Sequence, residues 1–185
     1  FDLTDHQADW LYVSNLAGNM EILDKLFRQA KEEGMKICFN PGKKELAQKE
    51  KLLGLLSDVD VLALNKDEIK QLIDGDDLEY LVRRAIHLVS VILLTDGVNG
   101  SIASDGKTII RAAMYDNRPS IDRTGAGDAF ASGFLSAWAK GKSLKDSVLF
   151  ASANSSSVVM KIGAKTGILR GEVDLHAMPI HEKEV

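Results

Sequence analysis

The sequence has few of the residues that build covalent or metal cross-links, and it has no long apolar run. Its single cysteine, Cys38, excludes an internal disulfide framework and a multi-cysteine metal site, and a reducing, cytoplasmic setting is expected. No stretch approaches the roughly 18 consecutive apolar residues of a membrane span, so no membrane association is expected. No Lys/Arg run marks a nucleic-acid surface, and 23 basic against 27 acidic residues give a net charge of −4, so no nucleic-acid partner is expected either.

The sequence also lacks the usual phosphate-binding loop. A Walker A motif needs a glycine five positions before its Gly-Lys-Ser/Thr. The two candidate sites, Gly106-Lys107-Thr108 and Gly141-Lys142-Ser143, have Ser101 and Ser136 at that position, so both are interpreted as turns. The histidines show neither metal-ligand spacing nor a partner motif, and no role is predicted for any of the four: His6, His87, His176 and His181.

The remaining composition, 45% hydrophobic and 27% charged, is that of a globular protein. Short β-type runs alternate with amphipathic helical stretches. Strands are predicted at 10–13, 36–39, 61–64 and 89–94, helices at 22–30, 46–56, 66–73 and 78–87, a hairpin at 101–112, and helices from Thr124 to near Gly141 and from Ser143 to about Lys161. No element is predicted after Gly171. The pattern favours one α/β domain over residues 1–185, a three-layer α/β/α Rossmann-like fold with a mostly parallel sheet and helices on both faces.

The most informative stretch is Asp122-Arg-Thr-Gly-Ala-Gly-Asp128, directly before a strongly apolar helix. Small residues at 125–127 let a bound group approach the backbone, and the first turn of a helix presents N–H groups and positive dipole charge. This is a candidate phosphate site, in which Asp128 could accept a proton from an attacking hydroxyl. The alternative interpretation is an ordinary glycine-containing loop with Asp128 as a helix-start acid.

Two further segments follow buried-type strands, where α/β folds bind ligands. Thr95-Asp-Gly-Val-Asn-Gly100 could be a ligand loop or a plain turn. Asn65 and Glu68 lie three residues apart, and their oxygens could hold a hydrated Mg²⁺. Asn65 could equally be the N-cap of a helix that begins with acidic residues.

Together these motifs resemble the ribokinase-like (PfkB) family of sugar and nucleoside kinases. The stretch 122–128 is similar to the family signature Asp-x-Thr-Gly-Ala-Gly-Asp, with Arg123 at the variable position. The family's Asn-x-x-Glu motif matches Asn65–Glu68, and its Thr-x-Gly-x-x-Gly loop matches 95–100. Phe150-Ala-Ser-Ala through Gly163-Ala164 is similar to the Ala-rich helix and Gly-Ala turn beside the adenine site. The motifs occur in family order across nearly the whole chain.

The resemblance implies a role for each matching residue. Asp128 would be the catalytic base, and the N–H groups of Gly125, Ala126 and Gly127 would form the anion hole. Asn65 and Glu68 would order Mg²⁺ and its waters, and Asp122 could help to hold K⁺. The residues that would border the nucleotide are Thr95, Gly97, Gly100, Thr124, Ser152 and Asn65.

The resemblance also implies the reaction: transfer of the γ-phosphate of ATP to an alcohol group of a sugar. A nucleoside kinase of the same family and a non-catalytic nucleotide-binding module are the alternatives. The chain resembles only the C-terminal, nucleotide-binding portion of the family and lacks the N-terminal part with its β-lid. We therefore expect low activity from the 185 residues alone, and the N-terminal segment or a second copy of the chain as a partner.

Overall fold

The computed structural model describes residues 3, 7–116, 120–171 and 173–185, so His6 lies outside the described residues. The chain divides into two compact units, Phe1–Leu94 and Thr95–Val185. The prediction of a single domain over residues 1–185 stays a prediction. Within the described part of the chain, no helix combines the length and the hydropathy that a membrane span requires.

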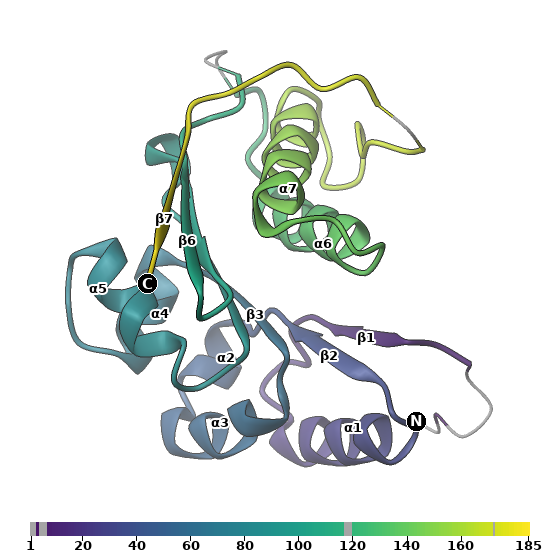
Figure 1. Ribbon diagram of the computed structural model, residues 1–185. Coiled ribbons are helices and arrows are strands. Elements are labelled where there is room, and N and C mark those ends of the chain that lie inside the picture. The colour runs from purple at the N-terminus through teal and green to yellow at the C-terminus, as the bar shows by residue number, and fades with distance from the viewer. Residues whose placement is uncertain (1–2, 4–6, 117–119, 172) are drawn as a thin grey trace. The chain divides into compact units, whose positions relative to one another are not determined.

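The first unit alternates strands with helices, as the sequence pattern predicts (Figure 1). Strand β1 pairs with β2 and β2 pairs with β3, both in parallel. The strands run in the same direction because a helical connection after each strand returns the chain to the end of the sheet at which that strand began. The strands are β1 (Trp10–Val13), β2 (Lys36–Phe39), β3 (Val61–Asn65) and β4 (Val91–Thr95). The helices are α1 (Met20–Glu32), α2 (Lys43–Leu46), α3 (Lys49–Leu55), η1 (Leu56–Asp58), α4 (Lys66–Leu72) and α5 (Leu78–Ala85).

The core of the first unit forms between α1 and β2. Leu23 and Phe27 of α1 are fully buried, as are Ile37 and Phe39 of β2. The rings of Phe27 and Phe39 meet edge to face, with centroids 5.3 Å apart and an interplanar angle of 83°. The helical spacing of the first pair and the continuous apolar run of the second bring these side chains together.

One predicted helix is divided in two. The leucine-rich stretch 46–56 predicts a continuous helix, but α2 ends at Leu46 and α3 begins at Lys49. Gln48, between them, leaves helical geometry with φ −103° and ψ 48°. Its side-chain amide donates hydrogen bonds to the carbonyls of Gly18 (2.8 Å) and Lys44 (3.2 Å). A contact with the loop after β1 accompanies the interruption, and local periodicity does not reveal it.

A buried carboxylate joins the loops that follow β1 and β2. Glu45 is fully buried in α2. Its Oε1 accepts hydrogen bonds from the backbone N–H of Leu16 (2.9 Å) and Gly18 (2.6 Å), and its Oε2 accepts one from Gly42 (3.0 Å). Buried charge is stable only with such partners, so Glu45 has a structural role.

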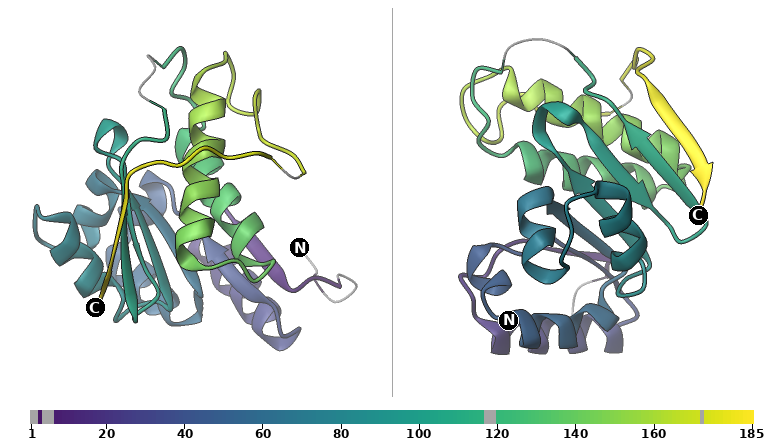
Figure 2. Two further views of the ribbon diagram at one scale, coloured as in Figure 1. Left: turned by 45° about the horizontal axis from the view of Figure 1, so that its top comes forward. Right: turned by 90° about the vertical axis from the view of Figure 1, so that its left-hand side faces the viewer.

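The second unit contains an antiparallel strand group and two long helices. The predicted hairpin is confirmed: β5 (Ser101–Ser104) pairs antiparallel with β6 (Thr108–Ala112). Strand β7 (Ile180–Glu184) pairs antiparallel with the other edge of β6, which the sequence did not predict. The helices are η2 (Gly97–Asn99), α6 (Ala126–Trp138) and α7 (Leu144–Val159). Helix α7 packs against β5 and β6, and α6 lies alongside α7 (Figure 2).

Small residues allow the close contact between α6 and α7. A Cβ on Gly133 would lie 3.0 Å from the Cβ of Asn154, so the absent side chain makes room for the neighbouring helix. Buried Asn154 donates from Nδ2 to the carbonyl of Ala129 (2.7 Å) and accepts at Oδ1 from the N–H of Leu169 (2.8 Å). These bonds tie α6, α7 and the loop after α7 together.

Candidate nucleotide site

The loop before α6 is held by a carboxylate. Asp122 accepts hydrogen bonds from the backbone N–H of Thr124 at Oδ1 (2.9 Å) and from the backbone N–H of Gly163 at Oδ2 (3.0 Å). These bonds, the one from Thr124 first, lower the pKa of Asp122 below its ordinary value because they stabilise the ionised form. Asp122 therefore links the 122–127 loop to the turn after α7.

Gly125 fits this loop because it has no side chain. It adopts φ +81° as the N-cap of α6, a left-handed conformation that disfavours other residues. A Cβ at this position would lie 2.7 Å from both the Cβ and the carbonyl oxygen of Ala164. The Gly163-Ala164 turn, which the family resemblance implies lies beside the adenine site, therefore packs directly against the signature.

Helix α6 begins beside open space. A Cβ on Gly127 would have no heavy atom within 4 Å, so another group can approach the backbone there. The first N–H groups of a helix have no intrahelical acceptors, and they carry the positive end of the helix dipole. Ser155 of α7 donates to the carbonyl of Ala126 (3.0 Å) and fixes this helix start. The exposed side chain of Asp128 lies in the same first turn.

A cavity of about 460 Å³ opens in the second unit, within the usual size range of small-molecule sites. Its wall is mostly apolar, with side chains such as Val98, Phe130 and Val159. Six of the residues predicted for the site line it: Thr95, Gly97, Gly100, Ala126, Gly127 and Ser152. The ligand loop, the helix start and the Ala-rich helix thus contribute to one cavity.

Other predicted residues lie outside this wall. The sequence neighbours of the lining residues include Thr124, Gly125 and Asp128. Asp122 does not line the cavity, and it holds the 122–127 loop through its hydrogen bonds from Thr124 and Gly163. Arg123, which stands at the variable position of the signature, does line the cavity.

Asn65 and Glu68 lie in the first unit, at the start of α4. The Asn65 side chain accepts a hydrogen bond from the N–H of Glu68 (2.9 Å), and the Glu68 carboxylate accepts one from the N–H of Asn65 (2.8 Å). This reciprocal capping box is the structural alternative that the sequence left open, and it is present. Among the described residues, no group of three or more His, Cys, Asp or Glu side chains is arranged to hold a metal ion.

Sequence reasoning missed two groups of lining residues. Ser155 and Ser156 lie three and four positions after Ser152, so helical spacing alone could have placed them on the same face of α7. Tyr115 and Asp116 follow β6 with no motif around them. Both contact His176, for which the sequence suggested no role.

Known proteins resemble this chain over most of its length. An ATP-dependent 6-phosphofructokinase of Thermoanaerobacterium thermosaccharolyticum is 29% identical, with 86% of this chain and 51% of that protein covered. The chain thus spans about half the length of the curated relatives it matches.

Two solved structures establish the fold. The nucleoside kinase of Methanocaldococcus jannaschii, a member of the ribokinase family, superposes with a TM-score of 0.74 at 27% identity, covering 91% of this chain and 55% of that one. The fructokinase of Vibrio cholerae O395 with fructose, ADP and calcium superposes with a TM-score of 0.75 at 22% identity, covering 85% and 56%. The predicted ribokinase-like α/β fold is confirmed.

The family profile of the pfkB family carbohydrate kinases matches residues 5–170, which include the 95–100 loop, the 122–128 signature and both cavity helices. The chain belongs to the pfkB carbohydrate kinase family.

Proposed function

We propose that this chain forms the nucleotide-binding part of an ATP-dependent phosphotransferase that transfers the γ-phosphate to an alcohol group of a sugar. One observation carries the proposal: the 95–100 loop, the start of α6 and the Ser152 face of α7 line a single cavity. Its apolar wall suits a nucleoside, and the N–H groups at the helix start suit a phosphate chain. The intact signature and the family membership support the same function.

In this proposal Asp128 acts as the general base. The alcohol oxygen forms a bond to the γ-phosphorus, the bond from that phosphorus to the ADP oxygen breaks, and the alcohol proton passes to the Asp128 carboxylate. The N–H groups of Gly125, Ala126 and Gly127 would stabilise the charge on the transferred group. The exposure of Asp128 beside Gly127 supports this role, since a base must reach the acceptor alcohol.

Two cations fit residues of this chain. Asn65 and Glu68 offer the hard oxygen atoms that suit Mg²⁺ held through water, and their reciprocal capping box holds both side chains at the start of α4. Bound Mg²⁺ neutralises charge on phosphate oxygens. Asp122 is a candidate K⁺ ligand because it stays ionised, although both of its oxygens already accept backbone N–H groups.

The alternative substrate is a nucleoside. The nucleoside kinase of Methanocaldococcus jannaschii is as good a structural match as the fructokinase, so the fold favours neither acceptor. A non-catalytic nucleotide-binding module is the third candidate function. The acid at position 128 argues against it, because binding alone needs no base.

The test measures ADP formation with a panel of sugars and nucleosides, beside calorimetric titration with ATP. Asp128→Asn should lower turnover about 100- to 10,000-fold and change ATP affinity less than threefold. Glu21→Gln, which neutralises an exposed acid in the first turn of α1, is the control and should change neither. Turnover is measured in a protein that also carries the N-terminal segment, because low activity is expected from the 185 residues alone. ATP binding by that longer protein without turnover on any acceptor supports the binding module, and near-normal turnover of its Asp128→Asn variant contradicts the assigned base.

A further inference from the structure

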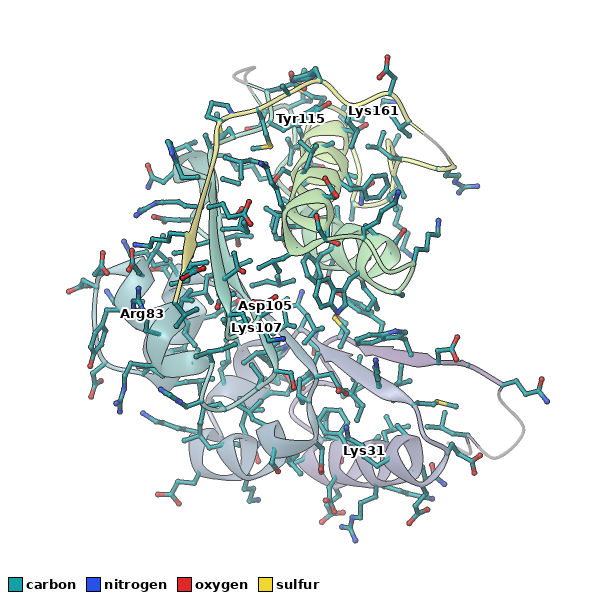
Figure 3. The ribbon with its side chains drawn as sticks, viewed as in Figure 1. Lys31, Arg83, Asp105, Lys107, Tyr115 and Lys161 are labelled. Carbon is teal, nitrogen blue, oxygen red and sulfur yellow. The ribbon has the colours of Figure 1, made fainter. Side chains whose placement is uncertain are left out.

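A polar cluster lies at one side of the cavity and has no part in the function proposed so far. It consists of Tyr115 and Asp116 after β6, Ser156 of α7, and His176 of the C-terminal segment; we call it the Asp116 cluster. Tyr115, Asp116 and Ser156 line the cavity. Figure 3 shows Tyr115 beside α7, and Figure 1 shows the C-terminal segment passing near that helix before it reaches β7.

His176 does not line the cavity, but it contacts Tyr115 and Asp116, which do. Its ring lies over that of Tyr115, with centroids 3.9 Å apart and an interplanar angle of 31°. Its backbone N–H donates to the Tyr115 hydroxyl (2.9 Å), and its Nε2 lies 3.2 Å from the Tyr115 carbonyl. A backbone bond from Ala113 to the carbonyl of Pro179 (3.0 Å) fixes the same segment. The position of Tyr115 and Asp116 is therefore set by tertiary contacts.

The Asp116 carboxylate retains hydrogen-bonding capacity toward the cavity. Its Oδ2 accepts from the Ser156 hydroxyl at 3.2 Å, and its Oδ1 lies 3.6 Å from His176 Nε2. An ionised carboxylate has about four lone-pair sites, so these two contacts leave room for further donors. The side chain is 30% exposed, and the residue lines the cavity.

The charges that line the cavity decide which part of a nucleotide could meet Asp116. A phosphate chain is attracted by Arg123 and by the N-terminus of α6 at Ala126 and Gly127, which also line the cavity. It is repelled by a carboxylate. The group facing Asp116 must then be the uncharged part of the ligand, whose hydrogen-bond donors are the ribose hydroxyls and the amino group of the base.

We propose that Asp116, held by Ser156 and His176, is a specificity-determining residue that accepts hydrogen bonds from the nucleoside part of the phosphate donor. This inference rests on the proposed function, because it requires the donor nucleotide to bind in this cavity. It adds the chemical feature by which the donor is recognised: a hydroxyl or amino hydrogen-bond donor opposite the Asp116 carboxylate.

The test is calorimetric titration of the 185-residue chain with ATP. Asp116→Ala should raise the Kd for ATP about 10- to 100-fold, since a hydrogen bond to a charged acceptor is lost. Asp116→Asn, which keeps the size and one acceptor oxygen, should raise it less. The control Asp174→Ala removes an exposed acid of the same C-terminal segment and should leave the Kd unchanged. Thermal unfolding of each variant checks that it is folded.

Nucleotide analogues identify the group that is recognised. With 2′,3′-dideoxy-ATP the effect of Asp116→Ala should vanish if the carboxylate meets the ribose, and with purine riboside triphosphate it should vanish if the carboxylate meets the amino group. An effect that persists in full on both analogues overturns the inference. An effect that disappears in EDTA assigns the carboxylate to the metal and also overturns it.

The two failures are distinguishable. If the wild-type chain binds no ATP, the proposed function fails and this inference fails with it. If the wild-type chain binds ATP and both Asp116 variants bind it equally well, only the inference fails.

Discussion

The glycines at 125 and 127 should respond in opposite ways to the same substitution. Gly125→Ala places a methyl group in a left-handed conformation, which costs about 1–2 kcal/mol. It also brings the new Cβ to 2.7 Å from Ala164, an overlap that typically costs about 1–3 kcal/mol. We therefore expect a loss of about 2–5 kcal/mol in the free energy of unfolding of the second unit.

Gly127→Ala should have the opposite effect on the free energy of unfolding. The new Cβ meets nothing within 4 Å, and alanine is favoured over glycine inside a helix by about 0.5–1 kcal/mol. Stability should therefore rise slightly. ATP affinity should fall about tenfold or more, because the methyl group occupies the space through which a phosphate would reach the backbone N–H groups.

Gly141→Ala separates the two costs at Gly125. Gly141 has φ +77°, but a Cβ there would have no neighbour within 4 Å, so this variant incurs the conformational cost without the overlap. The difference between Gly125→Ala and Gly141→Ala measures the contact with Ala164.

Urea unfolding followed by Trp138 fluorescence, in a Trp10→Phe background, reports on the second unit. With an m value of about 2 kcal/mol/M, Gly125→Ala should lower the unfolding midpoint by roughly 1–2.5 M. A midpoint for Gly125→Ala equal to that of Gly141→Ala would contradict the packing of the signature against the Gly-Ala turn. Unchanged ATP affinity of Gly127→Ala would contradict the anion site.

Three further predictions concern single side chains. The stability that Asp122 contributes should be present above its ordinary pKa of 3.8 and lost as the pH falls through its lowered folded pKa. The difference in unfolding free energy between wild type and Asp122→Asn should therefore shrink below about pH 4, and urea unfolding at a series of pH values measures it. Burial raises the pKa of the Cys38 thiol to about 12, so the folded chain should resist iodoacetamide at pH 8 and react fully in urea, and rapid labelling without urea would contradict this. Glu45→Ala leaves three backbone N–H groups without their acceptor and should lower the unfolding free energy by about 3 kcal/mol or more. Glu45→Gln should lower it less. A loss below about 1 kcal/mol for the alanine variant would refute the structural role.

Local sequence patterns were sufficient for most elements of this chain. The apolar run Val61–Leu64 and the Asp105-Gly106 turn each imply their structure from neighbouring residues alone, and β3 and the β5–β6 hairpin follow. The same holds for the start of α6, since a run of small residues before an apolar helix exposes N–H groups wherever it occurs.

Elements that depend on distant partners could not be predicted in this way. Strand β7 is an exposed, mostly polar edge strand, so it has no hydrophobic alternation and is defined only by its pairing with β6. The break between α2 and α3 coincides with hydrogen bonds from Gln48, one of which reaches Gly18 across 30 positions in the chain.

The features of the candidate site also fall into those that local sequence predicts and those that depend on distant partners. The sequence by itself determined which backbone segment is the candidate phosphate site and which acid lies beside it, because glycine conformation and helix ends are local properties. Only the tertiary structure brought the 95–100 loop, the start of α6 and the face of α7 to one cavity and set Asp116 against His176, 60 positions further along the chain. Such contacts join segments that carry no shared pattern, so they exist only once the chain has folded.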